Sequence, residues 1–317
     1  MNRLIVCAVG GNALISDPDH ISFEDQEAVA RRTAERIIGM VKQGWKVALT
    51  HGNGPQVGFE LIRSAAAAGR TPPLPMDACG AATQGLIGTM LVRGLRHAAA
   101  AAGLSIPIVS VVTHMVVDAA DPAFAKPTKP VGPFYDADTA AQMAKTQGWT
   151  VIEDAGRGWR RVVASPQPFE IAELDAIRAL VDSGALVVAC GGGGIPVVRK
   201  DGDLVGAAAV IDKDLASGLL AKSLGADRLI VATDVRRVQL DRGRPEQRDI
   251  DRLTSEQGLR YLAEGQFPAG SMGPKVRACA EFVASGGLAA AICHLDDLAE
   301  AADGKAGTQF VPEAALV

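Results

Sequence analysis

The chain has 317 residues, of which 48% are hydrophobic and 21% are charged, so it has the composition of a globular protein with a large core. It carries 32 Lys and Arg against 36 Asp and Glu, and the net charge of -4 argues against a protein that binds nucleic acid through a basic surface. No apolar stretch approaches the roughly 18 residues of a membrane span, and the first apolar run ends in Gly10-Gly11 rather than in a signal peptide. We therefore expect a cytoplasmic protein without nucleic-acid or membrane partners.

The cysteines are far apart, and no two of them form a C-x-x-C pair of the kind that holds zinc or exchanges disulfides. They are Cys7, Cys79, Cys190, Cys279 and Cys293. An odd number of widely separated cysteines is typical of buried thiols in a reducing compartment.

Short apolar runs alternate with longer helical patterns, which predicts an α/β fold with a largely parallel sheet. Between the first two runs, Ser22 and Asp25 form a capping-box pattern, and Gly44 marks the end of the predicted helix. The predicted buried strands are Leu4–Val9, Lys46–Thr50, Ile106–Thr113, Leu186–Ala189, Leu229–Thr233 and Leu288–Cys293.

A second helix is predicted over Ala78–Ala102, where the small residues Gly85, Gly88 and Gly94 interrupt an apolar stripe. These residues permit close helix packing, and a dimer contact is one interpretation. The proline-rich stretch 119–165 has no long apolar run, so we expect a small, partly exposed inserted subdomain.

After Pro168 a helical pattern resumes, with apolar residues at Ile171, Leu174, Ile177 and Leu180. The polar, turn-like segment Val198–Asp203 then suggests a change of domain.

Four predicted strands end in glycine-rich turns, which let backbone N–H groups approach an anion. The turns are Gly10-Gly11-Asn12, His51-Gly52-Asn53-Gly54-Pro55, Gly191–Gly194 and Gly270–Lys275. Taken one at a time, such glycines are equally well explained as tight connections between strands and helices. Together they predict a crevice that binds phosphate, although neither a P-loop nor a G-x-G-x-x-G spacing is present.

Four lysines lie among proline, glycine and apolar residues, and compact ammonium charges in such settings suit the neutralisation of phosphoryl oxygens. They are Lys126, Lys129, Lys213 and Lys275. Asp212 and Asp214 flank Lys213 at a predicted strand-to-helix junction, where they either cap the helix or orient lysines or a metal. No histidine pair or G-x-S-x-G motif is present, and we expect His51 to be a hydrogen-bonding loop residue rather than a general base.

Several segments, in order along nearly the whole chain, closely resemble carbamate kinases, which belong to the amino acid kinase family. They are Gly10–Leu14, His51–Gly58, Asp121–Phe124, Pro127–Pro130, Arg160–Val163, Gly191–Pro196, Val210–Ala216 and 269–276. The resemblance implies a three-layer αβα sandwich with a mostly parallel central sheet and a small protruding subdomain. It also implies the reversible reaction of ATP and carbamate to ADP and carbamoyl phosphate. The reaction would use Mg²⁺, run toward ATP in arginine catabolism, and take place in a homodimer.

The same resemblance assigns residues 1–200 to carbamate or carbamoyl phosphate, with the subdomain at about 119–165, and residues 201–317 to the nucleotide. It implies four catalytic residues: Lys129, Lys213, Asp214 and Lys275. The residues that would bind the substrate are Gly10, Gly11, Asn12, Gly52, Asn53, Gly54, Gly192 and Gly193. Those that would bind the nucleotide are Asp212, Lys213, Thr233, Asp234, Val235, Met272, Gly273 and Lys275. Whether Asp212, Asp214 or the substrate phosphates hold the metal stays open.

One segment departs from the carbamate kinase pattern. After Thr233-Asp234-Val235, those enzymes typically continue with an acidic residue and aromatic residues, whereas this chain has Arg236–Arg242. Two arginines there would favour contact with phosphate. Two alternatives therefore stand beside a carbamate kinase: a kinase of a different small carboxylate, and a nucleotide- or oxyanion-binding protein without turnover.

Overall fold

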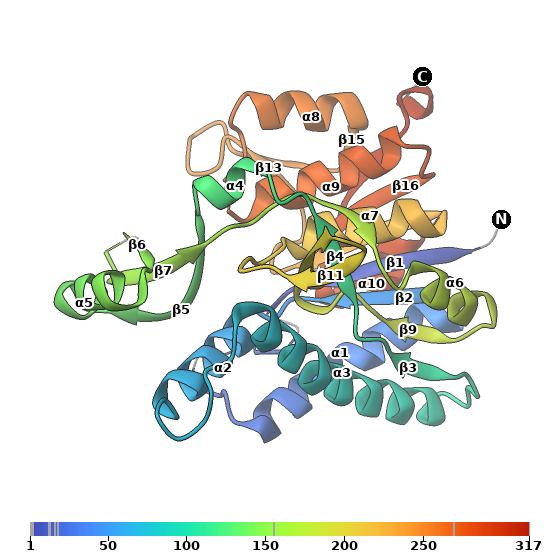
Figure 1. The fold of residues 1–317 in the computed structure, drawn as a ribbon. Coiled ribbons are helices and arrows are strands. Elements are labelled where there is room, and N and C mark those ends of the chain that lie inside the picture. The colour runs from blue at the N-terminus through green and yellow to red at the C-terminus, as the bar shows by residue number, and fades with distance from the viewer. Residues whose placement is uncertain are drawn as a thin grey trace.

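The computed structural model describes residues 3–11, 14–15, 17, 19–154, 156–268 and 270–316. Within these residues, an eight-stranded sheet forms the centre of the molecule (Figure 1). Neighbouring strands are parallel except for β16 and β17, which are antiparallel. The strands in spatial order are β15 (Arg252–Thr254), β17 (Thr308–Val311), β16 (Ala289–His294), β12 (Arg228–Thr233), β1 (Leu4–Val9), β2 (Lys46–His51), β9 (Leu186–Val188) and β3 (Ile108–Ser110). The six predicted strands are thus six consecutive neighbours in one sheet.

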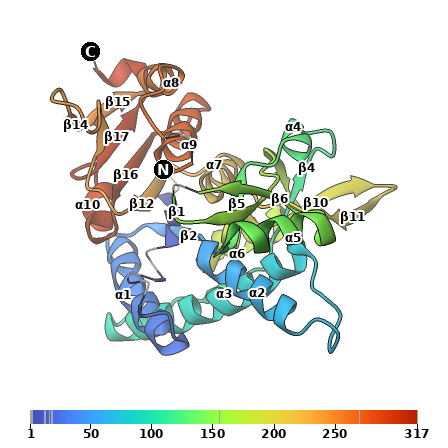
Figure 2. The same cartoon turned by 90° about the vertical axis from the view of Figure 1, so that its left-hand side faces the viewer.

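Helices cover both faces of the sheet, which gives the three-layer αβα sandwich (Figure 2). Alternate side chains of β1 belong to opposite cores, since Ile5 and Cys7 pack with one set of helices while Val6 and Ala8 pack with the other. The first set is α1 (Phe23–Lys42), α3 (Met76–Ala101) and α10 (Leu298–Ala302). The second set is α6 (Leu174–Asp182), α7 (Lys213–Leu224) and α9 (Met272–Ala284), with α8 (Ser255–Ala263) against α9.

The predicted capping box and the glycines of the second helix have clear structural roles. Ser22 is the N-cap of α1, and its side chain and that of Asp25 bond to each other's backbone N–H groups. A Cβ at Gly94 would lie 3.3 Å from the backbone oxygen of Ala30 in α1, and one at Gly88 would lie 2.3 Å from Ser110 Oγ. The small residues at 88 and 94 therefore permit packing within the chain, and a dimer contact there stays a prediction.

Two predicted elements have different limits. The strand expected over Ile106–Thr113 is confined to Ile108–Ser110. The helix expected from Ile171 begins only at Leu174, because β8 (Pro168–Ile171) is a strand that pairs antiparallel with β4 (His114–Val117). Both belong to a second sheet of order β11-β10-β4-β8. In this sheet, Val198–Asp203 comprises the end of β10 (Ile195–Lys200), the hairpin turn and the first residue of β11 (Asp203–Gly206). The turn is confirmed, while a domain boundary at this point stays a prediction.

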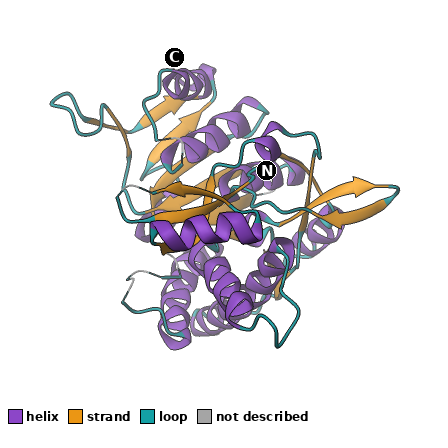
Figure 3. Cartoon of the chain, turned by 60° about the vertical axis from the view of Figure 1, so that its left-hand side comes forward, coloured by secondary structure: helices purple, strands orange, loops and turns teal. Residues whose placement is uncertain are grey.

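The proline-rich insert forms a small subdomain that projects from the body (Figure 1). Its three-stranded sheet has β7 (Trp159–Val163) between β5 (Lys129–Tyr135) and β6 (Thr150–Glu153). Helix α5 (Ala137–Gln147) connects β5 to β6. Figure 3 shows the helices of the chain in purple and its strands in orange. The remaining elements are α2 (Gly54–Ala66), α4 (Pro122–Ala125) and the hairpin of β13 (Val238–Leu240) with β14 (Arg248–Ile250).

The cysteines are buried and unpaired, as expected from their spacing. Burial raises the pKa of both Cys7 and Cys190 to about 12, so these thiols are protonated at neutral pH. Among the described helices, none is both long and apolar enough to cross a membrane.

Candidate active site

The four glycine-rich turns meet at one end of the central sheet, around a cavity of about 350 Å³. Because β1, β2 and β9 are parallel neighbours, the turns that follow them lie at the same edge. The N-terminus of α9 and the protruding subdomain complete the walls. The residues that line the cavity are Gly11, Gly52, Asn53, Gly54, Pro55, Val57, Lys129, Pro130, Val131, Arg160, Gly192, Val210, Ile211, Asp212, Lys213, Asp214, Gly270, Ser271 and Lys275. The predicted common crevice is therefore present, and its binding of phosphate stays a prediction.

Close packing explains why glycine is needed in the turn after β9. Gly192 has a φ of +67°, and a Cβ there would lie 2.3 Å from Asn53 Nδ2. The Asn53 side chain is itself fixed, because its Nδ2 donates to Thr83 Oγ1 at 2.8 Å. A Cβ at Gly191 would lie 2.3 Å from His51 Nε2. These contacts hold the two turns against each other and leave their backbone facing the cavity.

His51 has the structural role expected from the sequence. Its Nδ1 lies 3.0 Å from the carbonyl oxygen of Gly52, which fixes Nδ1 as the protonated nitrogen in the neutral ring. Burial lowers the pKa of His51 to about 4. The imidazole is therefore neutral at pH 7 and does not line the cavity.

Two lysines from different helices share one buried carboxylate. Lys213, in the first turn of α7, contacts Asp214 Oδ1, and Lys275 Nζ of α9 lies 2.8 Å from Asp214 Oδ2. Burial alone would raise the pKa of Asp214, but the two ammonium groups lower it to about 2. Burial lowers the pKa of Lys213. Burial also acts to lower the pKa of Lys275, but the charge and hydrogen bond of Asp214 outweigh it, and the pKa of Lys275 is raised. The cluster is an ionised triad that carries one net positive charge.

The fourth predicted catalytic residue reaches this cluster from the protruding subdomain. Lys129 begins β5, and its Nζ lies 2.9 Å from Asp212 Oδ2. The other oxygen of Asp212 accepts the backbone N–H of Asp214 at 2.9 Å, so Asp212 is the N-cap of α7. Asp212 thus both caps the helix and holds a lysine, which were the two roles considered for the carboxylates.

A second cavity, of about 520 Å³, adjoins the first. Its lining shares five residues with the first cavity: Gly11, Lys213, Gly270, Ser271 and Lys275. The other lining residues are Gly10, Ala232, Thr233, Asp234, His294, Leu295 and Asp296. Lys213 and Lys275 therefore lie where the two cavities meet, and the second cavity extends over the ends of β12 and β16.

The structure brings most predicted site residues to these two cavities. Gly10 and Thr233-Asp234 line the second one, while Gly54 and Gly192 line the first. Four predicted residues line neither. Gly193 packs against Ile211, Met272 packs against the core, Gly273 donates its N–H to Pro268, and Val235 follows the lining residue Asp234. Asn12 lies outside the described residues.

The two arginines of the unusual segment are bound to carboxylates instead of facing either cavity. Arg236 Nη1 lies 2.7 Å from both oxygens of Asp297, and Arg237 Nε lies 2.8 Å from Asp251. The segment continues into the β13–β14 hairpin. Neither arginine lines either cavity, and phosphate contact by these arginines stays a prediction.

Among the titratable residues that line the cavities, sequence reasoning gave no role to Arg160, His294 or Asp296. Arg160 stood in the Arg160–Val163 motif, but the motif did not tell which arginine faces the cavity. Successive residues of a strand point to opposite faces, and Arg161 lies over the ring of Trp149 at 4.9 Å instead. His294, at the end of β16, had no motif around it.

The described residues contain no group of three or more histidine, cysteine or acidic side chains placed to hold a metal ion. Asp212 and Asp214 are occupied by lysines.

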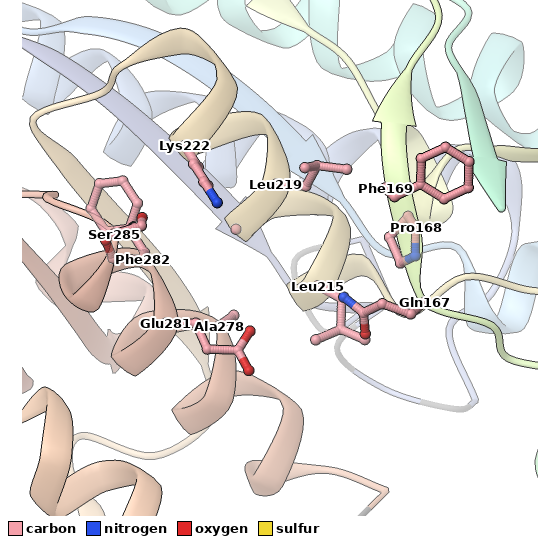
Figure 4. Close-up of a pocket in the computed structure, with 11 residues that line it drawn as sticks. Gln167, Pro168, Phe169, Leu215, Leu219, Lys222, Ala278, Glu281, Phe282 and Ser285 are labelled. Atoms are coloured by element: carbon pink, nitrogen blue, oxygen red, sulfur yellow. Dashed lines mark hydrogen bonds between the residues drawn. The ribbon is translucent and has the colours of Figure 1, made fainter. Parts of the chain in front are cut away.

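A further cavity, of about 310 Å³, lies between α7, α9 and β8 (Figure 4). Its walls include Phe169, Leu215, Leu219 and Phe282. It shares no lining residue with the two cavities above and contains none of the glycine-rich turns. It is separate from the site that the sequence predicted.

Comparison with known proteins agrees with this geometry. The amino acid kinase family model matches residues 3–294. The carbamate kinase of Pyrococcus horikoshii is 45% identical over 314 residues, which cover 98% of this chain and 100% of the relative. That of Clostridium perfringens is 44% identical over 312 residues, 97% of this chain and 99% of the relative. The structure of carbamate kinase from Giardia lamblia bound to AMP-PNP superposes with a TM-score of 0.92 at 41% identity, covering 99% of this chain and 100% of that chain. The chain belongs to the amino acid kinase family and, within it, to the carbamate kinases.

Proposed function

We propose that this chain transfers a phosphoryl group between carbamoyl phosphate and ADP, forming carbamate and ATP, and that it works mainly in this direction. The observation that carries the proposal is the position of Lys213 and Lys275 in the wall shared by two adjoining cavities. A phosphoryl group that passes from one cavity to the other would remain beside both ammonium groups. The solved relative bound to AMP-PNP supports a nucleotide in one of the two cavities.

The chemistry needs charge and position more than proton transfer. Carbamate leaves, or attacks, as an oxyanion, so an in-line transfer requires no strong general base. The two lysines offset the charge on the phosphoryl oxygens, and backbone N–H groups of the glycine-rich turns would bind the same oxygens. Asp214 holds the lysines in place, and the neutral His51 fits a site without a base.

Lys129 adds a third ammonium group from the protruding subdomain. Together with Pro130, Val131 and Arg160 it forms the part of the cavity wall that the subdomain supplies. Such a wall would exclude water that otherwise hydrolyses the phosphoryl donor.

Three further features of the proposal rest on the family resemblance. We propose that Mg²⁺ enters as part of the nucleotide substrate, since Mg²⁺ usually keeps several waters and binds through substrate phosphates. We also propose a homodimer and a cytoplasmic role in arginine catabolism. Sedimentation of the purified chain would test the dimer.

The test of the proposed function is ATP formation from ADP and carbamoyl phosphate in the presence of Mg²⁺, with Lys213→Ala as the control for a contaminating kinase. We expect rapid ATP formation by the parent chain and almost none by the variant. Equal rates from both proteins would assign the activity to a contaminant. A parent that folds and binds ADP but forms no ATP would refute the proposal, and faster turnover with acetyl phosphate would point to a different carboxylate.

A further inference from the structure

Arg160 is a permanent cation in the wall of the first cavity that the catalytic scheme above leaves without a role. It comes from β7, the middle strand of the subdomain sheet, and 21% of its side chain is exposed. Its guanidinium is held in place from two sides. Nε and Nη2 donate to the carbonyl oxygen of Gly132 at 3.2 and 3.0 Å, and Nη1 donates to Asp154 Oδ2 at 3.2 Å.

The hydrogen bonds of Arg160 leave a defined part of the guanidinium available. An arginine side chain has five N–H donors in a planar fork. The described contacts use one at Nε and one at each terminal nitrogen, so each of Nη1 and Nη2 retains one N–H. A pair of N–H groups on neighbouring nitrogens matches the two oxygens of a carboxylate.

The position of Arg160 is also fixed relative to the body. Gly132, which accepts two of its bonds, has a φ of +75°, and a Cβ at Gly58 of α2 would lie 3.4 Å from Gly132 Cα. The backbone of β5 therefore packs directly on α2, whose first residue, Gly54, lines the same cavity. Arg160 is tied to the point where the subdomain rests on the body.

We propose that Arg160 binds the carbamate end of the substrate, while the lysines and glycine-rich turns bind the phosphoryl end. This inference rests on the proposed function and adds the residue that recognises the acceptor. In the ATP-forming direction, the bond between phosphorus and the carbamate oxygen breaks, and its electron pair stays on that oxygen. A new bond forms between phosphorus and the terminal phosphate oxygen of ADP. The two N–H groups of Arg160 stabilise the resulting carboxylate, and no proton is transferred.

The chain offers a matched control for this proposal. Arg157 lies over the same Phe134 ring, at 4.8 Å against 5.1 Å for Arg160, and binds the same Asp154, at 3.3 Å. It does not line the cavity, and 63% of its side chain is exposed. Removing Arg157 therefore disturbs the same ring and the same carboxylate without touching the substrate.

The experiment compares Arg160→Ala, Arg160→Lys and Arg157→Ala with the parent chain. Three constants are measured in the ATP-forming assay: kcat/KM for carbamoyl phosphate, the KM for ADP, and the inhibition constant of inorganic phosphate against carbamoyl phosphate. Phosphate is the informative probe, because it has a phosphoryl end but no carboxyl end. Circular dichroism establishes that each variant is folded, and Arg160→Gln replaces Arg160→Ala if the smaller side chain prevents folding.

For Arg160→Ala we expect kcat/KM for carbamoyl phosphate to fall about 10- to 100-fold, with the other two constants changed less than about twofold. Arg160→Lys should regain little of the lost kcat/KM, because an ammonium group lacks the planar fork of a guanidinium group. Arg157→Ala should match the parent. An equal weakening of phosphate would place Arg160 at the phosphoryl end and overturn the proposal. An equal loss in Arg157→Ala would make its role structural, and an unchanged kcat/KM would remove it from binding. No ATP formation by the parent would instead refute the proposed function.

Discussion

The two walls of the first cavity are built differently. On the body side, Lys213 and Lys275 are buried at the starts of two core helices and share Asp214. On the subdomain side, Lys129 and Arg160 are partly exposed and lie on a separate small sheet. The first wall is fixed by the main core, whereas the second has its own strands and contacts the body through Lys129 at Asp212 and through Gly132 on α2. We infer that the body fixes the path of the phosphoryl group and that the subdomain recognises and encloses the substrate.

The largest effect should come from breaking the body wall at Asp214. In Asp214→Ala, two buried ammonium groups lose their carboxylate, so we expect both the loss of ATP formation and a decrease of about 3–5 kcal/mol in the free energy of unfolding. Urea denaturation would measure the decrease. Adding Lys275→Met to this variant removes one unpaired charge and should restore part of the stability. If Asp214→Ala alone were as stable as the parent, Asp214 would not pair with Lys213 and Lys275 in the folded chain.

Removing Lys129 should affect activity but not stability. Lys129→Ala takes away one charge that stabilises the transferred group, which is typically worth about 10²- to 10³-fold in turnover. Its bond to Asp212 is partly exposed to solvent, so the free energy of unfolding should change by less than about 1 kcal/mol.

Lys126→Ala is the matched control for this variant, because Lys126 is an exposed lysine of the same insert that lines neither cavity. Its turnover should equal that of the parent. Normal turnover in Lys129→Ala would remove Lys129 from the mechanism and would leave the subdomain wall without a catalytic charge.

The sheet was predictable from the sequence because its strands are short apolar runs that are buried on both faces. All six predicted strands lie side by side, and only Ile106–Thr113 was much too long, since apolar residues continue past Ser110 into the connection to β4. The start of α6 was misplaced for a related reason. Ile171 fits a helical spacing, but Pro168–Ile171 pairs with β4, and such a long-range partner leaves no mark in the local sequence.

The site was predictable where local chemistry marks it, as in the glycine-rich turns and the Asp212-Lys213-Asp214 sequence. The carbamate kinase resemblance gave a catalytic role to Lys129, which the structure joins to Asp212, 83 positions further along the chain. Arg160 and His294 were missed because only the tertiary fold brings them to a cavity. The ion pairs of Arg236 and Arg237 could not be predicted, because their carboxylate partners, Asp297 and Asp251, are distant in sequence.

A smaller effect should appear in the pH dependence of stability, and it probes how firmly the body wall is packed. Burial lowers the pKa of His51 from 6.5 to about 4, so the unfolded chain binds a proton more readily than the folded chain. The free energy of unfolding should therefore decrease as the pH falls from about 6.5 to 4, by up to about 3 kcal/mol from this residue. Chemical denaturation at several pH values would measure the slope. His51→Gln should flatten it, and an unchanged slope would show that His51 is not buried in its neutral form.

The smallest effect is expected outside both walls, at Arg236. Its guanidinium is bound to Asp297, it lines neither cavity, and its side chain is mostly exposed, so Arg236→Ala should change the KM for ADP by less than about twofold. Thr233→Val provides the contrast, because Thr233 lines the second cavity and its hydroxyl would be lost at constant size. We expect this variant to raise the KM for ADP while the KM for carbamoyl phosphate stays near that of the parent. If Arg236→Ala had the larger effect, the segment after Val235 would bind the nucleotide in place of the ends of β12 and β16. The division of the site into a phosphoryl path fixed by the body and a substrate enclosure supplied by the subdomain would then need a third, nucleotide-binding element.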